Sequence, residues 1–237
     1  MSKVNTMRKI KNFEFNDLFV FDLANNHQGN FDHGKMIIES LSSVSKSNKI
    51  YSGIKFQFRN LENFIHKDFK DDQNNKHIKR FLSTELSWDE FFKLKVFAKQ
   101  NGLMTICTPF DEISVKKIEE MGFDILKIAS CSADDWPLLE KAALTGLPMI
   151  VSTGGLNINQ IDNLVSFFEH KGVTFSLMHC VSIYPMNEEN AQLNFILKLK
   201  SRYPNITIGW STHESPDNFS IIKMAYSCGA RMYERHV

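Results

Sequence analysis

The sequence has little cysteine, no excess of either charge and no long apolar run, and each shortage excludes a class of protein. Its four cysteines, Cys107, Cys131, Cys180 and Cys228, occur singly and never as a C-x-x-C pair. This spacing argues against a zinc knuckle or a disulfide framework and favours small buried thiols. The formal net charge is +1, from 28 basic and 27 acidic residues that are interspersed. No broad field therefore favours nucleic acid or an anionic membrane, and any anion must be bound locally.

The targeting signals of membrane and secreted proteins are also missing. No run approaches the roughly 18 consecutive apolar residues of a membrane span, and the polar start Met1–Asn5 lacks the apolar core of a signal peptide. We therefore expect a cytoplasmic protein without membrane or nucleic-acid partners. A length of 237 residues suits one domain, residues 1–237, in which residues 1–17 form an N-terminal extension.

Eight short apolar runs alternate with amphipathic segments along the chain. Most of the runs are nearly continuous in hydrophobicity, which is typical of parallel strands covered on both faces. The segments between them carry apolar residues at helical spacing, and several end in a glycine suited to a left-handed helix terminus. This alternation predicts an α/β protein with a parallel (β/α)8 TIM barrel. The runs are Leu18–Leu23, Ile50–Phe56, Leu103–Cys107, Ile125–Ile128, Met149–Val151, Thr174–Met178, Ile206–Ile208 and Arg231–Tyr233, and the glycines are Gly102, Gly122, Gly146, Gly172 and Gly229.

Polar residues follow nearly every apolar run. In a barrel of this kind the carboxyl ends of the strands converge on one mouth, where active sites lie. Residues two apart on a strand point to the same side, so polar pairs with that spacing face the mouth together. Three such pairs occur, namely Lys55 with Gln57, Ser211 with His213, and Glu234 with His236.

Two kinds of site are suggested by these strand ends. His213 and His236, on neighbouring strands, can coordinate one divalent ion and leave positions open for substrate and water. Lys55 and Lys127 make a cluster suited to phosphate or carboxylate together with nearby hydroxyls. The alternatives are hydrogen-bonded histidines and solvated lysines at the rim of the barrel. The hydroxyls are those of Thr108, Ser130, Ser152, Thr153 and Ser211.

The segment Arg59–Glu85, after the second apolar run, is long and polar. Long loops at the mouth of a barrel often cover the active site, so this segment is a candidate lid. Solvated disorder is the alternative.

Short motifs mark all eight strand ends, in the order Asn26-His27-x-Gly29, Lys55-Phe56-Gln57, Thr108-Pro109-Phe110, Lys127-Ile128-Ala129-Ser130, Ser152-Thr153-Gly154, His179-Cys180-x-Ser182-x-Tyr184-Pro185, Gly209-x-Ser211-x-His213 and Glu234-Arg235-His236. Their order and spacing, from about Phe19 to the end of the chain, resemble the sialic acid synthase family. These enzymes make N-acetylneuraminate and related nonulosonic acids.

The resemblance implies a condensation of phosphoenolpyruvate with an open-chain, N-acetylated amino sugar similar to N-acetylmannosamine, with release of phosphate by C–O cleavage. It implies Mn²⁺ or Mg²⁺ on His213 and His236, and an acidic group, Asp22, for proton transfer. Lys55 and Lys127 would be catalytic with these three residues. Phosphoenolpyruvate would be held by Lys55, Thr108, Lys127, Ser130, Ser152, Ser182 and Ser211, and the substrate site would also include Asn26, Gln57, Phe110, Tyr184 and Glu234.

The chain departs from the family pattern in two side chains. Asp22 stands where the family usually has Glu, so the carboxylate is one methylene shorter. Ser132 stands where members commonly place a Glu that contacts the sugar, so a different polyol is expected to fit. Asp134 or Asp135 is the candidate to compensate.

A third departure is that the chain stops at Val237, directly after the last motif. The family continues with the helix that completes the barrel and with a small antifreeze-like domain that supplies an arginine to the partner subunit. We therefore expect an incompletely closed barrel with apolar surface on its first and eighth strands, weak phosphoenolpyruvate binding and slow turnover. The full-length form is expected to be a homodimer.

Three other functions fit part of the pattern. A metal-dependent aldolase or sugar isomerase would also use two histidines and a lysine at the mouth of a barrel. A Schiff-base aldolase would need one desolvated lysine, for which Lys55 and Lys127 are the candidates. The missing end and Ser132 would suit a catalytically impaired binding or assembly subunit.

Overall fold

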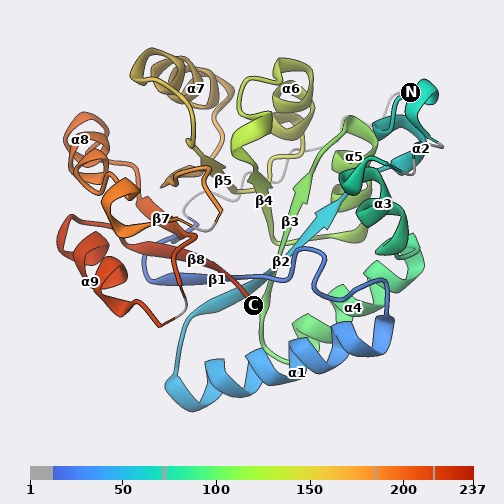
Figure 1. Cartoon of the computed structure of the whole chain (residues 1–237). Coiled ribbons are helices and arrows are strands. Elements are labelled where there is room, and N and C mark those ends of the chain that lie inside the picture. Colours follow the sequence, from blue (N-terminus) through green and yellow to red (C-terminus); the bar gives the residue numbers. More distant parts are fainter. Residues whose placement is uncertain (1–12, 71, 73, 185, 216) are drawn as a thin grey trace, which may run out of the picture.

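Eight parallel strands form a closed barrel in the computed structural model of the chain, which describes residues 13–70, 72, 74–184, 186–215 and 217–237 (Figure 1). Most of the predicted N-terminal extension lies outside the described residues. The strands follow one another around the barrel in sequence order. They are β1 (Leu18–Asp22), β2 (Ser52–Phe58), β3 (Met104–Pro109), β4 (Ile125–Ile128), β5 (Met149–Ser152), β6 (Phe175–His179), β7 (Ile208–Thr212) and β8 (Met232–His236).

The barrel is closed between its first and last strands, so the prediction of incomplete closure is wrong. β1 pairs with β8 in parallel from Leu18↔Met232 to Asp22↔His236. Pairing of strands depends on their own backbone groups and needs no helix on the outer face. On that outer face Phe19 is 36% exposed and stacks on Tyr233, with ring centroids 5.3 Å apart.

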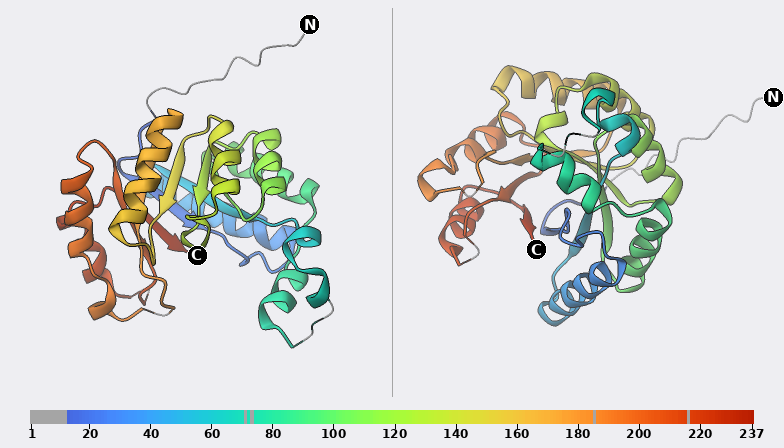
Figure 2. Two further views of the ribbon diagram at one scale, coloured as in Figure 1. Left: turned by 90° about the horizontal axis from the view of Figure 1, so that it is seen from above. Right: turned by 45° about the vertical axis from the view of Figure 1, so that its right-hand side comes forward.

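Helices cover the outside of the barrel (Figure 1). None in the described part of the chain is long and apolar enough to cross a membrane. The described part of the candidate lid contains two short helices and a 3-10 turn, Lys67–Phe69, and it projects on the side of the barrel where the chain ends (Figure 2, left). The helices are α1 (Phe31–Asn48), α2 (Leu61–Phe64), α3 (Lys76–Ser83), α4 (Trp88–Gln100), α5 (Glu112–Met121), α6 (Trp136–Leu144), α7 (Ile158–Lys171), α8 (Asn194–Arg202) and α9 (Phe219–Ser227).

Local sequence sets where these helices begin and end. Ser87 and Glu90 form a reciprocal capping box at the start of α4, which satisfies backbone donors that have no partner within the helix. Gly122 and Gly172 end α5 and α7 in the left-handed conformation, with φ of 69° and 66°. All five glycines predicted at helix ends have positive φ, which confirms the repeat that was inferred from them.

The buried apolar residues of the described chain form two cores. The larger core lies between the strands and the surrounding helices and includes Phe56, Phe58, Leu94, Phe168 and Trp210. The smaller one fills the interior of the barrel toward the amino ends of the strands, and it comprises Phe15, Leu18, Val20, Ile106, Ile125, Ile150, Met178 and Met232.

The inward-facing side chains of each strand change from apolar to polar toward the mouth. On β8, inward Met232 is followed by Glu234 and His236, and on β4 Ile125 is followed by Lys127. Several strands extend past their apolar runs into the polar residues, because the backbone ladder continues regardless of side-chain polarity. β7, for example, runs to Thr212 rather than ending at Ile208. The apolar layer therefore forms a floor on which the polar residues lie.

Candidate active site

A cavity of about 360 Å³ occupies the mouth of the barrel. It is lined by every predicted site residue except Asn26 and Thr153, and residues from all eight strands or the loops that follow them contribute to it. The lining comprises Asp22, Lys55, Gln57, Arg59, Thr108, Phe110, Lys127, Ala129, Ser130, Cys131, Ser152, Cys180, Ser182, Tyr184, Ser211, His213, Glu234 and His236.

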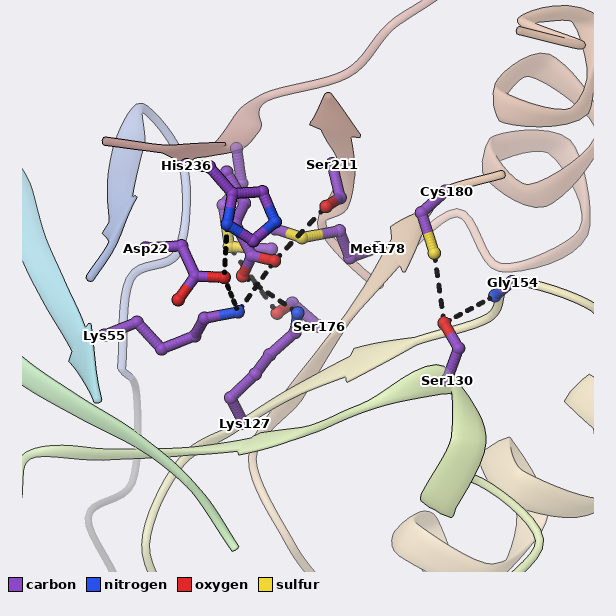
Figure 3. Close-up of polar contacts among 12 residues, drawn as sticks. Asp22, Lys55, Lys127, Ser130, Gly154, Ser176, Met178, Cys180, Ser211 and His236 are labelled. Atoms are coloured by element: carbon purple, nitrogen blue, oxygen red, sulfur yellow. Dashed lines mark hydrogen bonds and ion pairs between the residues drawn. The ribbon is translucent and has the colours of Figure 1, made fainter. Parts of the chain in front are cut away.

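A buried network of charges forms the base of this cavity. The carboxylate of Glu234 bridges the two lysines, with Oε1 at 2.9 Å from Lys55 Nζ and Oε2 at 2.9 Å from Lys127 Nζ. Lys55 Nζ also lies 3.0 Å from Oδ2 of Asp22. Ser211 Oγ donates to Glu234 Oε1 at 3.2 Å. Figure 3 shows Lys55 and Lys127 extending toward a common point, with Asp22 and His236 beside it.

The ion pairs determine the protonation of this network. Burial favours neutral Glu234, but Lys127 and Lys55 outweigh it and lower the pKa of the carboxyl below its usual range. Burial likewise opposes the charge of Lys55, and Asp22 and Glu234 overcome it, so the pKa of Lys55 is raised. Burial lowers the pKa of Lys127, which has Glu234 as its carboxylate partner. Of the two lysines, Lys55 is therefore the one whose charge the network stabilises.

A second polar cluster lies on the β4–β6 side of the cavity (Figure 3). Ser130 Oγ accepts a hydrogen bond from the Gly154 backbone N–H at 3.1 Å and lies 3.1 Å from Cys180 Sγ. Gly154 has no room for a side chain, because an added Cβ would lie 2.7 Å from Cys180 Sγ. Thr108 Oγ1, which also borders the cavity, is buried without a hydrogen-bond partner. These groups supply donors for a polar ligand.

His213 and His236 lie beside each other at the outer part of the cavity, with ring centroids 6.0 Å apart. His213 Nδ1 is 2.8 Å from the Val181 carbonyl, so Nδ1 carries the proton and Nε2 keeps a free lone pair. His236 Nδ1 lies 3.4 Å from Asp22 Oδ2. Burial lowers the pKa of His213, which favours the neutral ring that binds metals. Tyr184 packs on His213 with a centroid separation of 4.0 Å.

The two imidazoles fit a shared divalent ion. With ring centroids 6.0 Å apart, the two side chains are close enough for one divalent ion to be held between them. The hydrogen bond at His213 Nδ1 and the contact of His236 Nδ1 with Asp22 would orient the rings, as such contacts do in metal sites. Among the described residues no group of three or more His, Cys, Asp or Glu side chains is arranged to hold a metal. Water and substrate oxygens would therefore complete the coordination.

Several residues considered from the sequence lie outside the cavity. The Thr153 hydroxyl donates to the Met178 carbonyl at 3.3 Å instead of lining the cavity. The Asn26 side-chain amide donates to the Val237 carbonyl, and a role for Asn26 in substrate binding stays a prediction. Asp135 caps α6 by accepting from the Leu138 N–H at 3.2 Å, and neither it nor Asp134 lines the cavity. The proposed compensation for Ser132 by these two carboxylates therefore has no support from their positions.

Four residues that line the cavity were not predicted from the sequence, namely Arg59, Ala129, Cys131 and Cys180. Arg59 was assigned to the start of the lid, although it follows Lys55 and Gln57 at the spacing that places all three on one side of β2. That spacing was the signal that could have identified it. The cysteines gave no such signal, because single cysteines are usually buried apolar residues.

The chain also matches a known protein family over most of its length. Residues 48–237 match the model of the NeuB family. The chain is similar to spore coat polysaccharide biosynthesis protein E of Chromobacterium violaceum, with 43% identity and a TM-score of 0.90 over 93% of this chain and 66% of that one. It is also similar to an N-acetylneuraminic acid synthetase of Leptospira borgpetersenii, solved with citrate, with 34% identity and a TM-score of 0.81 over 92% and 72% of the two chains.

Human N-acetylneuraminate-9-phosphate synthase is 28% identical over 92% of this chain and 61% of its own length. The chain spans about three fifths of the length of the first curated relatives that it matches.

Proposed function

Because the chain belongs to the NeuB family, we propose that it condenses phosphoenolpyruvate with an N-acetylated amino-sugar aldehyde to give a nonulosonic acid and phosphate. Relatives named as sialic acid and legionaminic acid synthases support an enzyme of this kind. The observation that carries the proposal is the Lys55–Glu234–Lys127 bridge beneath the hydroxyl-lined cavity.

Phosphoenolpyruvate would lie above Lys127, toward Thr108, Ser130 and Ser152. Lys127 Nζ has three N–H donors, and its carboxylate partner Glu234 occupies one side, which leaves donors for the ligand. The unpartnered Thr108 hydroxyl faces the same cavity. Donors that are already fixed in position lose little free energy to reorganisation when they bind a small anion. The enol carbon of the bound phosphoenolpyruvate would point to the outer part of the cavity.

The acceptor aldehyde would lie between this ligand and the histidines. A divalent ion on His213 and His236 would supply Lewis-acid polarisation of the aldehyde oxygen. The enol carbon of phosphoenolpyruvate attacks the aldehyde carbon and leaves a cationic carbon, to which water adds before phosphate departs with the bridging oxygen. Asp22, between Lys55 and His236, is placed to accept a proton from that water. Gln57 and Tyr184 would contact the sugar.

The ion pairs of Lys55 weigh against a Schiff base on that residue. Such chemistry needs a neutral lysine amine, whereas Lys55 lies between two carboxylates that raise its pKa. Burial lowers the pKa of Lys127, so of the two lysines Lys127 is the one to test. Borohydride reduction with substrate present should leave no covalent adduct on Lys55, and an adduct on Lys127 would contradict the proposed condensation.

The test is phosphate release from phosphoenolpyruvate with a panel of N-acetyl hexosamines and diacetamido-dideoxy hexoses. We expect release that requires both an acceptor and Mn²⁺. Release without an acceptor, or consumption of acceptor without phosphoenolpyruvate, would contradict the proposal.

A further inference from the structure

We propose that Arg59 forms a subsite for an anionic group, a phosphate or a carboxylate, carried by the acceptor sugar. The inference deepens the function proposed above and depends on it for the identity of the ligand as an acceptor. It makes Arg59 a specificity-determining residue. The proposal is based on the half-buried guanidinium of Arg59, which lies at the edge of the cavity and has few hydrogen-bond partners.

Arg59 directly follows β2 and continues the series of side chains on its inward side. Lys55, Gln57 and Arg59 alternate along the strand and the residue after it, so they rise in that order from the base of the cavity to its rim. Lys55 belongs to the charge network, and Gln57 lies above it. A ligand that reaches from the reaction centre past Gln57 would therefore meet Arg59 with its far end.

The aromatic surroundings hold this guanidinium in place. Its Cζ lies 3.8 Å from the ring centroid of Phe110, 4.6 Å from that of Phe81 on α3 and 5.9 Å from that of Phe64 on α2. Rings contact the faces of a guanidinium and leave its N–H groups, which point outward in the plane, to bind acceptors. A planar donor group fixed in this way suits the oxygens of a phosphate or carboxylate.

The charge of Arg59 has no carboxylate partner within ion-pair distance among the described residues. The one hydrogen bond found for its side chain runs from Nη2 to Gln57 Oε1 at 2.9 Å, and Nε is buried without a partner. Burial, followed by repulsion from Arg80, lowers the pKa of Arg59 to about 10, while Asp22 gives a weaker opposing effect. The cation is retained at neutral pH, and an arriving anion would supply the partner that the fold does not.

Neighbouring charges determine the side from which the anion approaches. A second cavity of about 220 Å³ lies on the lid side of Arg59, and both Glu62 and Glu85 line it. Carboxylates there disfavour an anion. In the central cavity, the carboxylates of Asp22 and Glu234 are already paired with lysines. The anion would therefore contact Arg59 from the central cavity, next to Gln57.

Binding of matched sugars to the 237-residue protein tests this subsite. The probes are an N-acetyl hexosamine, its 6-phosphate and the corresponding uronic acid, each titrated calorimetrically with and without saturating phosphoenolpyruvate. We expect one or both charged sugars to bind roughly tenfold or more tightly than the neutral sugar. The pair of charged probes shows whether phosphate or carboxylate is preferred.

Variants assign any preference to Arg59. Arg59→Gln should remove the preference and change affinity for the neutral sugar and for phosphoenolpyruvate little, whereas Arg59→Lys should keep part of it. Arg80→Gln, an exposed arginine stacked near the same Phe81, is the matched control and should keep it fully. If Arg59 only held the lid in place, Arg59→Gln would instead lower the affinity for all three sugars by the same factor.

Several results would overturn the subsite. One is equal binding of neutral and charged sugars by the wild type, and another is a preference for charged sugars that survives in Arg59→Gln. A third is a preference that saturating phosphoenolpyruvate abolishes, because this would place the sugar phosphate in the phosphoenolpyruvate site. If the wild type binds neutral and charged sugars equally, or binds none of the three sugars, the subsite is overturned even if Arg59→Gln fails to fold. A preference that depends on Arg59 without any phosphoenolpyruvate binding would support the subsite and contradict the proposed function.

Discussion

Glu234 and Lys127 are 107 residues apart in the chain, and their side chains meet inside the barrel at 2.9 Å. Both are almost fully buried. Such a pair contributes little net stability when intact, but removal of one partner leaves an uncompensated charge. Glu234 neutralises Lys55 as well, so its carboxylate is the member whose loss affects the most charges.

Glu234→Gln should therefore destabilise the protein by about 3–5 kcal/mol, because two buried ammonium groups lose their shared counter-ion. Urea unfolding measures the change. Glu140→Gln removes the exposed partner of Lys171, and it should cost less than about 1 kcal/mol. A cost for Glu234→Gln as small as that of the control would mean that the lysines are solvated or neutral.

Lys127→Ala should weaken phosphoenolpyruvate binding at least about tenfold, because it removes a charge-assisted donor at the base of the cavity. Calorimetric titration measures the affinity. Lys116→Ala, on the outer surface of α5, has the same change in charge and should bind as the wild type does. Unchanged affinity in Lys127→Ala would place the ligand elsewhere.

His213→Ala and His236→Ala should each weaken Mn²⁺ binding at least about tenfold, because each removes one of two nitrogen donors. Paramagnetic resonance of free Mn²⁺ gives the bound fraction. His170→Ala, at an exposed position of α7, is the control. Mn²⁺ binding that is equal in all three variants would remove the histidines from the metal site.

His27 should make the fold sensitive to acid. Burial, followed by repulsion from His33, lowers its pKa from 6.5 to about 4. The unfolded chain then takes up the proton more readily, so stability is unaffected above about pH 6.5 and falls by roughly 3 kcal/mol as the pH decreases to about 4. The buried ring packs against Phe91 and accepts from the Gly29 N–H, a contact that suits neutral imidazole.

The measurement is the free energy of unfolding of wild type and His27→Asn across that pH range. The variant should lose less stability on acidification, and His170→Asn should follow the wild type. Parallel curves for wild type and His27→Asn would show that folding does not lower the pKa of His27.

The sequence predicted the strands and most residues that line the cavity well, because both follow from local patterns. Apolar runs and helix-ending glycines identified the eight strands, and polar residues after the runs identified the cavity. Local patterns say nothing about which side chains meet across a barrel, which depends on strand stagger. The Glu234 bridge between Lys55 and Lys127, and the contact of Asn26 with Val237, were therefore out of reach. The prediction that the barrel would be incompletely closed was wrong, because it assumed that β1 and β8 need a helix on their outer face in order to pair.

The central claim is that phosphoenolpyruvate and an amino-sugar aldehyde are joined with C–O cleavage at the Lys55–Glu234–Lys127 site. The direct measurement is mass spectrometry of both products after incubation in water labelled with heavy oxygen, with Mn²⁺ and the acceptor that releases most phosphate. The account predicts a nine-carbon keto acid, and phosphate that carries no label because it keeps the bridging oxygen. Labelled phosphate, which marks P–O cleavage, or phosphate without the new acid would contradict it.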